Sequence, residues 1–91
     1  MIVSIDGYTF DNCFYDREVD VLYLHKGPSS DAVDFDACPE GHHTRYDAQG
    51  NLVGITTLNA RLLLEEDGVI TVTLPDRVLA TRDLGDVLTA A

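Results

Sequence analysis

The segment HHTRYDAQGNLVGITTL, residues 42–58, indicates more about the fold than any other part of this sequence. Its two halves, 42–46 and 51–58, have the composition of extended chain, and the connection between them begins with Asp47 and ends with Gly50. Asp at the first position and Gly at the fourth favour a type I turn that closes with a left-handed residue. The segment therefore predicts a β-hairpin with a bulge beside its turn.

Residues 14–24 repeat the pattern of this hairpin. They align with residues 45–55, so that Tyr15 matches Tyr46, Asp16 matches Asp47, and Asp20 matches an asparagine. Turn chemistry by itself selects Asp at such positions. We therefore interpret the repeat as two similar hairpins rather than as a duplicated unit.

Residues 19–25, which follow the turn of the first of these two hairpins, are apolar on both faces of the expected strand. One face holds Val19, Val21, Tyr23 and His25, and the other holds Leu22 and Leu24. A strand of this kind is typical of a sheet that is covered on both sides. We expect the second cover to be a helix or another subunit.

Short strands are expected on both sides of these hairpins. Residues 2–5 are expected to be extended up to the turn dipeptide at 6–7. A second extended run is expected to contain Tyr8 and Phe10 and can continue to Phe14-Tyr15. Residues 31–37 alternate, which predicts a half-buried strand. Its inward residues would be Val33, Phe35 and Ala37, with Asp34 and Asp36 in solvent.

The last third of the chain predicts a helix, a strand and a second helix. Asn59 is expected to cap a helix over residues 60–66, and the dipeptide at 67–68 is expected to end it. Residues 69–74 alternate as a strand, and a helix is expected from Asp83, with Leu84, Val87 and Leu88 on one side. The fold expected is a single α+β domain over residues 1–91, a mostly antiparallel β-sheet of five to seven short strands built from hairpins with one or two short helices.

Composition narrows the function classes. The chain has 91 residues, is 45% hydrophobic and carries a net charge of −10, a mixture too apolar for a disordered acidic tail. Its six basic residues are scattered rather than clustered, which argues against direct nucleic-acid binding. An acidic surface instead attracts basic proteins and cations.

Targeting signals are not apparent in the sequence. The first six residues lack the basic and apolar regions of a signal peptide, and apolar runs such as Leu62–Leu64 are far too short for a membrane span. We therefore expect a cytoplasmic protein that does not bind membranes. In a reducing compartment Cys13 and Cys38 are expected to be free thiols that pack as small apolar residues.

Two motifs taken in order resemble the domain of unknown function 2283 family. The first is Tyr15-Asp16-x-x-x-Asp20-x-Leu22-Tyr23. The second is Tyr46-Asp47-x-x-Gly50-x-Leu52-Val53-Gly54-Ile55-x-x-Leu58-Asn59-Ala60. The similar region covers about residues 13–64 and leaves a C-terminal strand–helix extension over 65–91. This chain departs from the family pattern at 42–45, where the family often has apolar residues, and at Arg61, where the family usually has serine.

The resemblance implies a small β-rich domain of the kind found in bacteria, archaea and phages. It implies no catalytic residues. Some members lie beside small RelE-like toxins and are proposed to be antitoxins, a role that suits an acidic protein facing a basic one. The motif positions that would form a binding site are Tyr15, Asp16, Asp20, Tyr23, Tyr46, Asp47, Gly50, Gly54 and Asn59.

The Tyr and Asp residues of these motifs have two interpretations. They could line a small polar pocket or supply acid–base groups. The structural alternative, which we favour, is that tyrosines pack with their hydroxyls at the rim of the core while aspartates cap turns.

A second candidate site is a metal site at Asp34, Asp36, Cys38, His42 and His43. Carboxylate, thiolate and imidazole together suit zinc or another transition metal. The spacing matches no established zinc motif, however, and adjacent histidines on a strand point to opposite faces. Solvent exposure explains the alternating aspartates equally well.

The apolar surfaces predict a homodimer. A chain of 91 residues has few layers with which to cover both faces of 19–24, the leucines at 62–64 and the C-terminal stripe. The favoured function is a small acidic interaction domain, antitoxin-like, that binds a basic protein partner. The alternatives are a protein that binds a metal or small ligand through Asp34–His43, with hydrolase activity left open, and a purely structural homo-oligomer. We favour a non-enzymatic protein without a cofactor.

Overall fold

The structure, a computed structural model, describes residues 2–28, 31–82, 84 and 87–88. Nine strands and the helix α1 make up the part of the chain that it describes. The elements are β1 (Val3–Ile5), β2 (Tyr8–Phe10), β3 (Asn12–Asp16), β4 (Val21–His25), β5 (Asp34–Ala37), β6 (His43–Tyr46), β7 (Leu52–Leu58), α1 (Ala60–Asp67), β8 (Ile70–Thr73) and β9 (Val78–Thr81). The fold is therefore mostly antiparallel β-sheet with one short helix, which confirms the expected α+β class.

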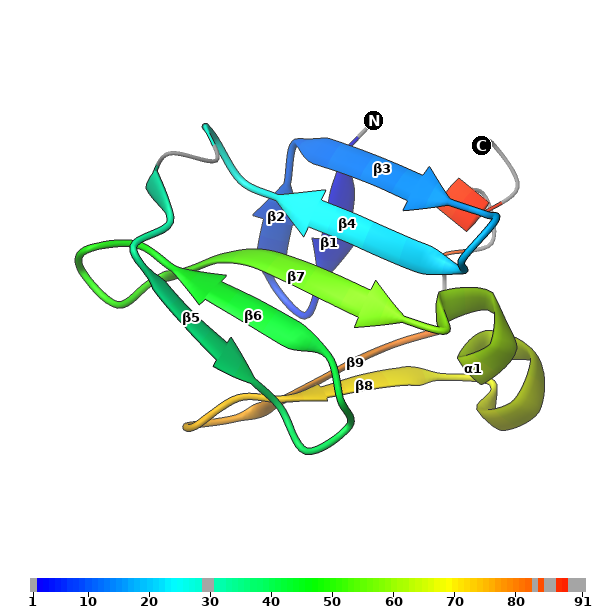
Figure 1. Cartoon of the computed structure of the whole chain (residues 1–91). Coiled ribbons are helices and arrows are strands. Elements are labelled where there is room, and N and C mark those ends of the chain that lie inside the picture. The colour runs from blue at the N-terminus through cyan, green and yellow to red at the C-terminus, as the bar shows by residue number, and fades with distance from the viewer. Residues whose placement is uncertain (1, 29–30, 83, 85–86, 89–91) are drawn as a thin grey trace.

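The hairpins β3–β4 and β6–β7 join in one antiparallel sheet of order β3-β4-β7-β6-β5 (Figure 1). The turn at 47–50 has the predicted form. The Gly50 amide donates to the Asp47 carbonyl at 3.0 Å, and Gly50 has φ 82°, with a register shift between Arg45 and Tyr46. The hairpin prediction from the sequence is thus confirmed in detail.

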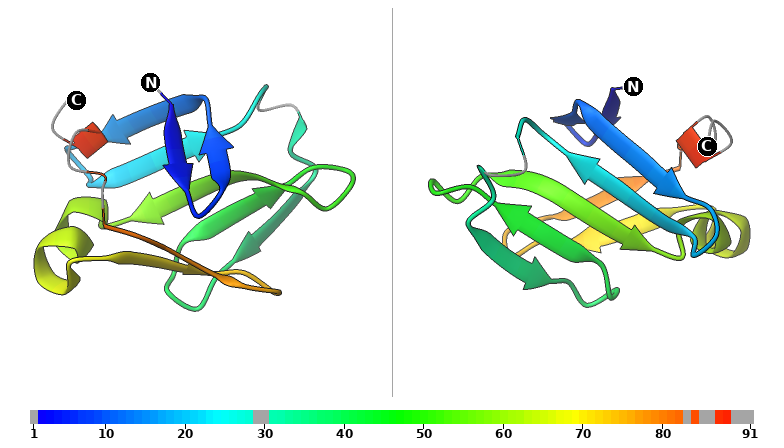
Figure 2. Two further views of the ribbon diagram at one scale, coloured as in Figure 1. Left: turned by 180° about the vertical axis from the view of Figure 1, so that it is seen from behind. Right: turned by 45° about the horizontal axis from the view of Figure 1, so that its top comes forward.

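The core lies on one side of this sheet only. The pairs β1–β2 and β8–β9 cross behind it, as the reverse view shows (Figure 2). Apolar side chains from all three sheets and from α1 meet there. The cluster consists of Val3, Ile5, Phe10, Tyr15, Leu22, Leu24, Leu52, Ile55, Ala60, Ile70, Val72, Leu74, Leu79, Leu84 and Leu88.

The other side of the sheet, called the open face below, has no such cover in the described chain. Strand register places the following residues on it: Asn12, Phe14, Asp16, Val21, Tyr23, His25, Phe35, Ala37, His43, Arg45, Gly54, Thr56 and Leu58. Of the two expected covers for residues 19–25, a helix of this chain over the open face is therefore absent from the described residues, whereas cover by another subunit stays a prediction. Leu22 and Leu24 are buried, whereas Val19 lies in an exposed turn and Tyr23 faces solvent.

Strand β5 differs from its prediction in the same way. All four of its residues are exposed, and Val33 just before it is exposed too. The alternation of Phe35 with its flanking aspartates is real, but β5 is the last strand of the sheet and lies beyond the core. The expected inward positions thus have no core to face.

The helix begins and ends almost where expected. It runs over Ala60–Asp67, and Gly68 follows in the left-handed conformation with its amide bonded to the Leu64 carbonyl at 3.0 Å. The N-terminal cap is not as expected, because Asn59 is itself left-handed, with φ 58°, and its side chain caps nothing. An aspartate from outside the helix takes that role.

The C-terminal part contains a strand that the sequence did not suggest. Ile70, Val72 and Leu74 point inward as predicted, but β9 then returns antiparallel to β8. The nine described strands exceed the expected five to seven. Most of the helix expected from Asp83 lies outside the described residues, although Leu84 and Leu88 are buried and joined by a helical hydrogen bond of 3.0 Å.

Candidate functional site

The first family motif converges on the start of α1. The Tyr15 hydroxyl donates to Asp20 Oδ1 at 2.7 Å. The same carboxylate accepts the backbone amides of Arg61 at 2.8 Å and Leu62 at 3.1 Å. Asp20 therefore caps the helix across the fold and satisfies amides that the helix leaves without intrahelical partners.

The charge states in this cluster follow from its hydrogen bonds. Burial by itself would raise the pKa of Asp20, but the Arg61 amide, the Tyr15 hydroxyl and the Leu62 amide all stabilise the carboxylate, and its pKa is lowered. Burial, followed by the bond to Asp20, raises the pKa of Tyr15. A stable carboxylate next to a protonated phenol suits a fixed structural cap.

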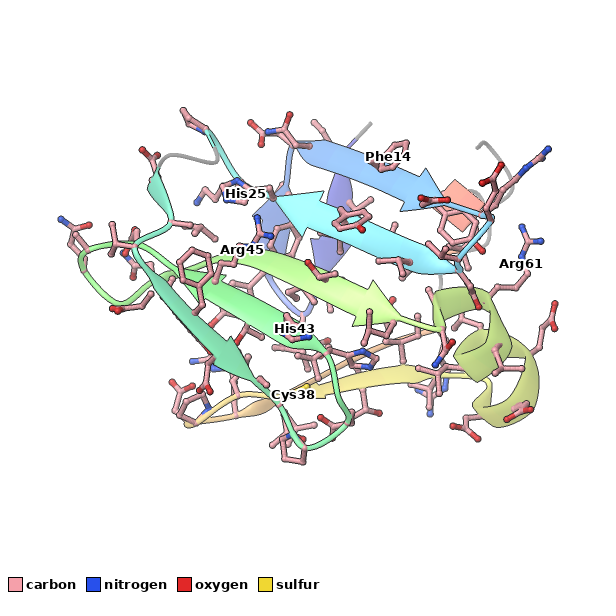
Figure 3. All side chains as sticks on the ribbon, viewed as in Figure 1. Phe14, His25, Cys38, His43, Arg45 and Arg61 are labelled. Atoms are coloured by element: carbon pink, nitrogen blue, oxygen red, sulfur yellow. The ribbon has the colours of Figure 1, made fainter. Side chains whose placement is uncertain are left out.

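Arg61 explains one departure from the family pattern. Its guanidinium lies over the Tyr15 ring, with 5.6 Å from Cζ to the ring centroid, and its Nη2 donates to the Leu88 carbonyl at 2.8 Å. The arginine thus joins the Tyr15–Asp20 cluster to the C-terminal segment. Figure 3 shows Arg61 beside the first turn of the helix.

Asp16 and Asp47 have the same local role in their two turns. Asp16 accepts the Glu18 amide at 3.1 Å, and Asp47 accepts the amide two residues onward at 3.0 Å. Asp47 also accepts the Asn51 amide at 2.8 Å; this bond first, and the other turn hydrogen bonds with it, lower the pKa of its carboxyl. These bonds support the interpretation of the internal repeat as shared turn chemistry.

The remaining family positions lie apart from one another. Tyr23 stacks with Phe14 on the open face, with ring centroids 5.9 Å apart. The Tyr46 hydroxyl is buried without a hydrogen-bond partner among the described residues. At Gly54 an added Cβ would come within 3.0 Å of the His25 ring and 3.3 Å of Arg45, so glycine allows these two side chains to approach across the strand.

The five metal candidates are not brought together by the fold. His42 is buried at 1% exposure, whereas His43 is exposed on the open face. Asp34 and Asp36 lie on the exposed edge strand, and Cys38 follows it. Across the described residues, no three His, Cys, Asp or Glu side chains form a group that could hold a metal ion.

The hydrogen bond of His42 also argues against a metal at its other nitrogen. The Leu58 amide donates to Nδ1 at 3.1 Å, so Nδ1 carries the lone pair and the neutral ring carries its proton on Nε2. A protonated Nε2 cannot coordinate a metal. Burial lowers the pKa of His42 and so favours this neutral form. The nearby Glu40 carboxylate acts in the opposite direction on this pKa, but its effect is smaller.

Glu40 fixes the neighbouring turn. Its carboxylate accepts the Thr73 hydroxyl at 2.6 Å and the Thr73 amide at 2.9 Å, which ties the β5–β6 turn to β8. Burial would raise the pKa of Glu40, but these bonds outweigh it and hold the pKa at about 2. Here too the polar groups are engaged in holding the fold.

Two exposed aromatic residues that the sequence analysis did not name as functional candidates lie on the open face. Phe14 is 62% exposed and Phe35 is 69% exposed, at opposite edges of the open face. Between them Arg45 lies over the Phe35 ring, with 5.8 Å from Cζ to the centroid (Figure 3). The signal for Phe14 was its position next to Tyr15, because neighbours on a strand point to opposite faces and only one of them can enter the core.

The comparisons with known proteins agree with this description without adding a function. No helix in the described part of the chain has the length and apolarity to cross a membrane. Neither a curated protein nor a solved structure matches the chain. The family model described as Protein of unknown function (DUF2283) matches residues 13–61, from β3 to the first turn of α1 and more than half of the chain. The motifs that position Asp20 and shape the two hairpins fall inside this match, and the chain belongs to the DUF2283 family.

Proposed function

We propose that this chain is a homodimeric, acidic interaction domain of the cytoplasm that binds a basic protein partner by adding one of the partner's strands to β5. The observation that carries the proposal is the position of β5. It is the last strand of a five-stranded sheet, all four of its residues are exposed, and two of them are aspartates.

An edge strand offers backbone donors and acceptors to an incoming strand. Asp36 pairs with the buried Thr44 and therefore lies on the core side of the sheet, whereas Phe35 pairs with Arg45 on the open face. A partner segment that alternates basic and apolar residues would place its basic side chains beside Asp34 and Asp36, and its apolar side chains beside Phe35. The recognised chemistry is an extended, basic segment.

The same two aspartates select against a second copy of this chain at this edge. Pairing of β5 with β5 would bring aspartates from the two copies close together, and facing like charges destabilise strand pairs. The net charge of −10 adds to this repulsion and favours a basic partner. An antitoxin-like role, in which β5 covers part of a basic partner, is the form of this function that the resemblance to the family suggests.

The test uses the whole tagged chain, expressed in the cells that naturally encode it and analysed by native mass spectrometry after capture. The variant Asp34→Asn with Asp36→Asn removes two charges from β5. The amide side chain introduced by Asp36→Asn keeps an oxygen for the Ala37 amide, which Asp36 accepts at 2.8 Å. The control, Glu65→Gln with Glu66→Gln, removes the same charge from exposed positions of α1.

We expect the wild type and the helix control to retain one basic protein in a fixed ratio, and the β5 variant to lose at least tenfold in affinity for it. Measurement with the purified pair would then give the dissociation constants. The proposal fails if no basic protein is retained, if the β5 variant binds as tightly as the wild type, or if the helix control loses as much.

A further inference from the structure

The open face carries two ladders of paired residues that run across all five strands. The first is Phe14–Tyr23–Thr56–His43–Ala37, and the second is Asn12–His25–Gly54–Arg45–Phe35. The central strand β7 contributes Thr56 and Gly54, and the side chains of His25 and Arg45 lie against Gly54. Phe14 and Phe35 are exposed at the two edges, and two sheets can pack face to face through side chains of this kind.

The charges on this face nearly cancel, unlike those of the whole chain. Among the acidic residues that the structure describes, only Asp16 belongs to the open face, which also carries Arg45, His25 and His43. Two copies that each carry −10 repel one another least where their acids are fewest. The open face is therefore where a second copy can approach, whereas the edge at β5 excludes one.

His25 and the groove beside it mark the part of this face that a second copy would meet. His25 Nδ1 lies 3.0 Å from the Gly27 carbonyl, which can only accept, so Nδ1 carries the proton and Nε2 is an acceptor. Nε2 is buried without a hydrogen-bond partner among the described residues. A groove of about 230 Å³ lies beside it, lined by Asn12, Phe14, Tyr23, His25, Arg45 and Thr56 among others.

We propose that a second copy of this chain packs on the open face, with a two-fold axis parallel to β7 between the two sheets. Such an axis keeps each residue at its level along the strands and exchanges β3 with β5 and β4 with β6. The partner copy's second ladder then lies over this one in reverse order. Its phenylalanine from position 35 meets the groove beside Asn12, and its arginine from position 45 meets His25.

Charge selects this axis over the other in-plane choice. A two-fold axis perpendicular to the strands would place β6 over β6 and bring the two copies of Arg45 close together. The axis parallel to β7 instead sets each Arg45 above the partner copy's β4, which offers the exposed Tyr23 ring. An arginine above an aromatic ring gains a cation–π interaction.

The area of the face sets the expected affinity. Five strands about 4.8 Å apart and about 17 Å long cover roughly 400 Å² in projection. The accessible area is larger than this projection because side chains protrude from the sheet. It still lies below or near the roughly 800 Å² that each partner buries in a standard interface. We therefore expect a dimer with a dissociation constant in the micromolar range.

The test is sedimentation velocity of the whole purified chain between 1 and 300 μM, about two decades around that value. The interface variant is Phe14→Ser, on β3 and far from β5. The control is Val78→Ser, at a residue of similar exposure, 58%, on β9 behind the sheet. We expect the wild type and Val78→Ser to dimerise alike, and Phe14→Ser to weaken dimerisation at least tenfold.

The outcomes separate this inference from the proposed function, on whose homodimer it rests. A wild-type chain that stays monomeric at 300 μM overturns the dimer and this interface together, whereas partner binding at β5 stands or falls with the Asp34 and Asp36 variant. A dimer that Phe14→Ser leaves intact, or that Val78→Ser weakens equally, overturns only the interface. A monomer whose Phe14→Ser variant loses a retained heterologous protein assigns the face to that protein and also overturns the inference.

Discussion

At the scale of single residues, most of the buried or hydrogen-bonded polar side chains described above stabilise the fold. Tyr15 and Asp20 illustrate this. Both belong to the first family motif, and together they could have been an acid–base pair. Their 2.7 Å hydrogen bond and the two helix amides on the same carboxylate make them a structural cap instead. A motif can therefore be specific to a family because it fixes the fold rather than because it performs a reaction.

His42 predicts a dependence of stability on pH. Its pKa is lowered in the folded state by burial, so below about pH 6.5 the unfolded chain takes up a proton more readily than the folded chain. The free energy of unfolding should therefore fall from pH 7 toward pH 5, by at most about 1.4 kcal/mol per pH unit from this residue. Urea unfolding at several pH values measures the slope.

The variant His42→Asn should flatten that slope, because an asparagine oxygen can accept the Leu58 amide without titrating. The control is His43→Asn, since His43 is exposed and adjacent. Equal slopes in the wild type and in His42→Asn would show that His42 does not carry the effect. Glu40, with its pKa of about 2, contributes in a separate window, where stability is lost below about pH 4.5.

At the scale of elements, helix α1 depends on a residue that is distant in sequence. Its own cap position, Asn59, contributes no side-chain hydrogen bond, and Asp20 serves the helix from the β3–β4 turn. Helix α1 and the β3–β4 hairpin should therefore stabilise each other. Asp20 itself has φ 55°, a conformation that aspartate tolerates better than most residues.

Replacing this cap gives a direct prediction. Asp20→Ala should lower the free energy of unfolding by about 1–2 kcal/mol, because it leaves helix amides and the Tyr15 hydroxyl unpaired. Asp16→Ala in the same turn, which loses one exposed hydrogen bond, should cost about 0.5 kcal/mol or less. Chemical denaturation measures both, and equal losses in the two variants would contradict the role given to Asp20.

At the scale of the whole molecule, the two proposed interactions should respond to salt in opposite directions. A net charge of −10 attracts a basic partner and repels a second copy. Screening lengths shrink from about 10 Å at 0.1 M salt to about 3 Å at 1 M. Raising the salt concentration from about 0.1 to about 0.5 M should therefore weaken partner binding severalfold and strengthen dimerisation.

Titration of the purified pair and sedimentation of the chain alone measure the two responses. Parallel responses would mean that one of the two interfaces has been assigned the wrong charge balance. The double variant at Asp34 and Asp36 should reduce the salt dependence of partner binding more than that of the dimer, because both aspartates lie on the proposed partner strand and off the open face.

Features that depend on neighbours along the chain could be predicted from the amino-acid sequence. The turn at 47–50, a helix predicted over 60–66 and ended by the dipeptide at 67–68, and the inward set Ile70, Val72 and Leu74 could all be predicted. Turn geometry, helix termination by glycine and alternation each act over a few residues. The family motifs could also be recognised in the sequence, because they contain the turn residues of the same two hairpins.

Which faces of the sheet are covered depends instead on how distant segments pack. Phe35 alternates with aspartates as a core residue would, yet β5 lies at the edge of the sheet and beyond the core. The residues of the proposed metal site are close in sequence but do not come together in the structure. The two aspartates lie on the edge strand β5, a turn follows Cys38, and the two histidines point to opposite faces of the sheet. Alternation shows that neighbouring residues of a strand point to opposite faces of the sheet. Whether a given face meets the core or solvent depends on the strand order and on the layers packed against the sheet. Contacts between segments that are distant in sequence determine both.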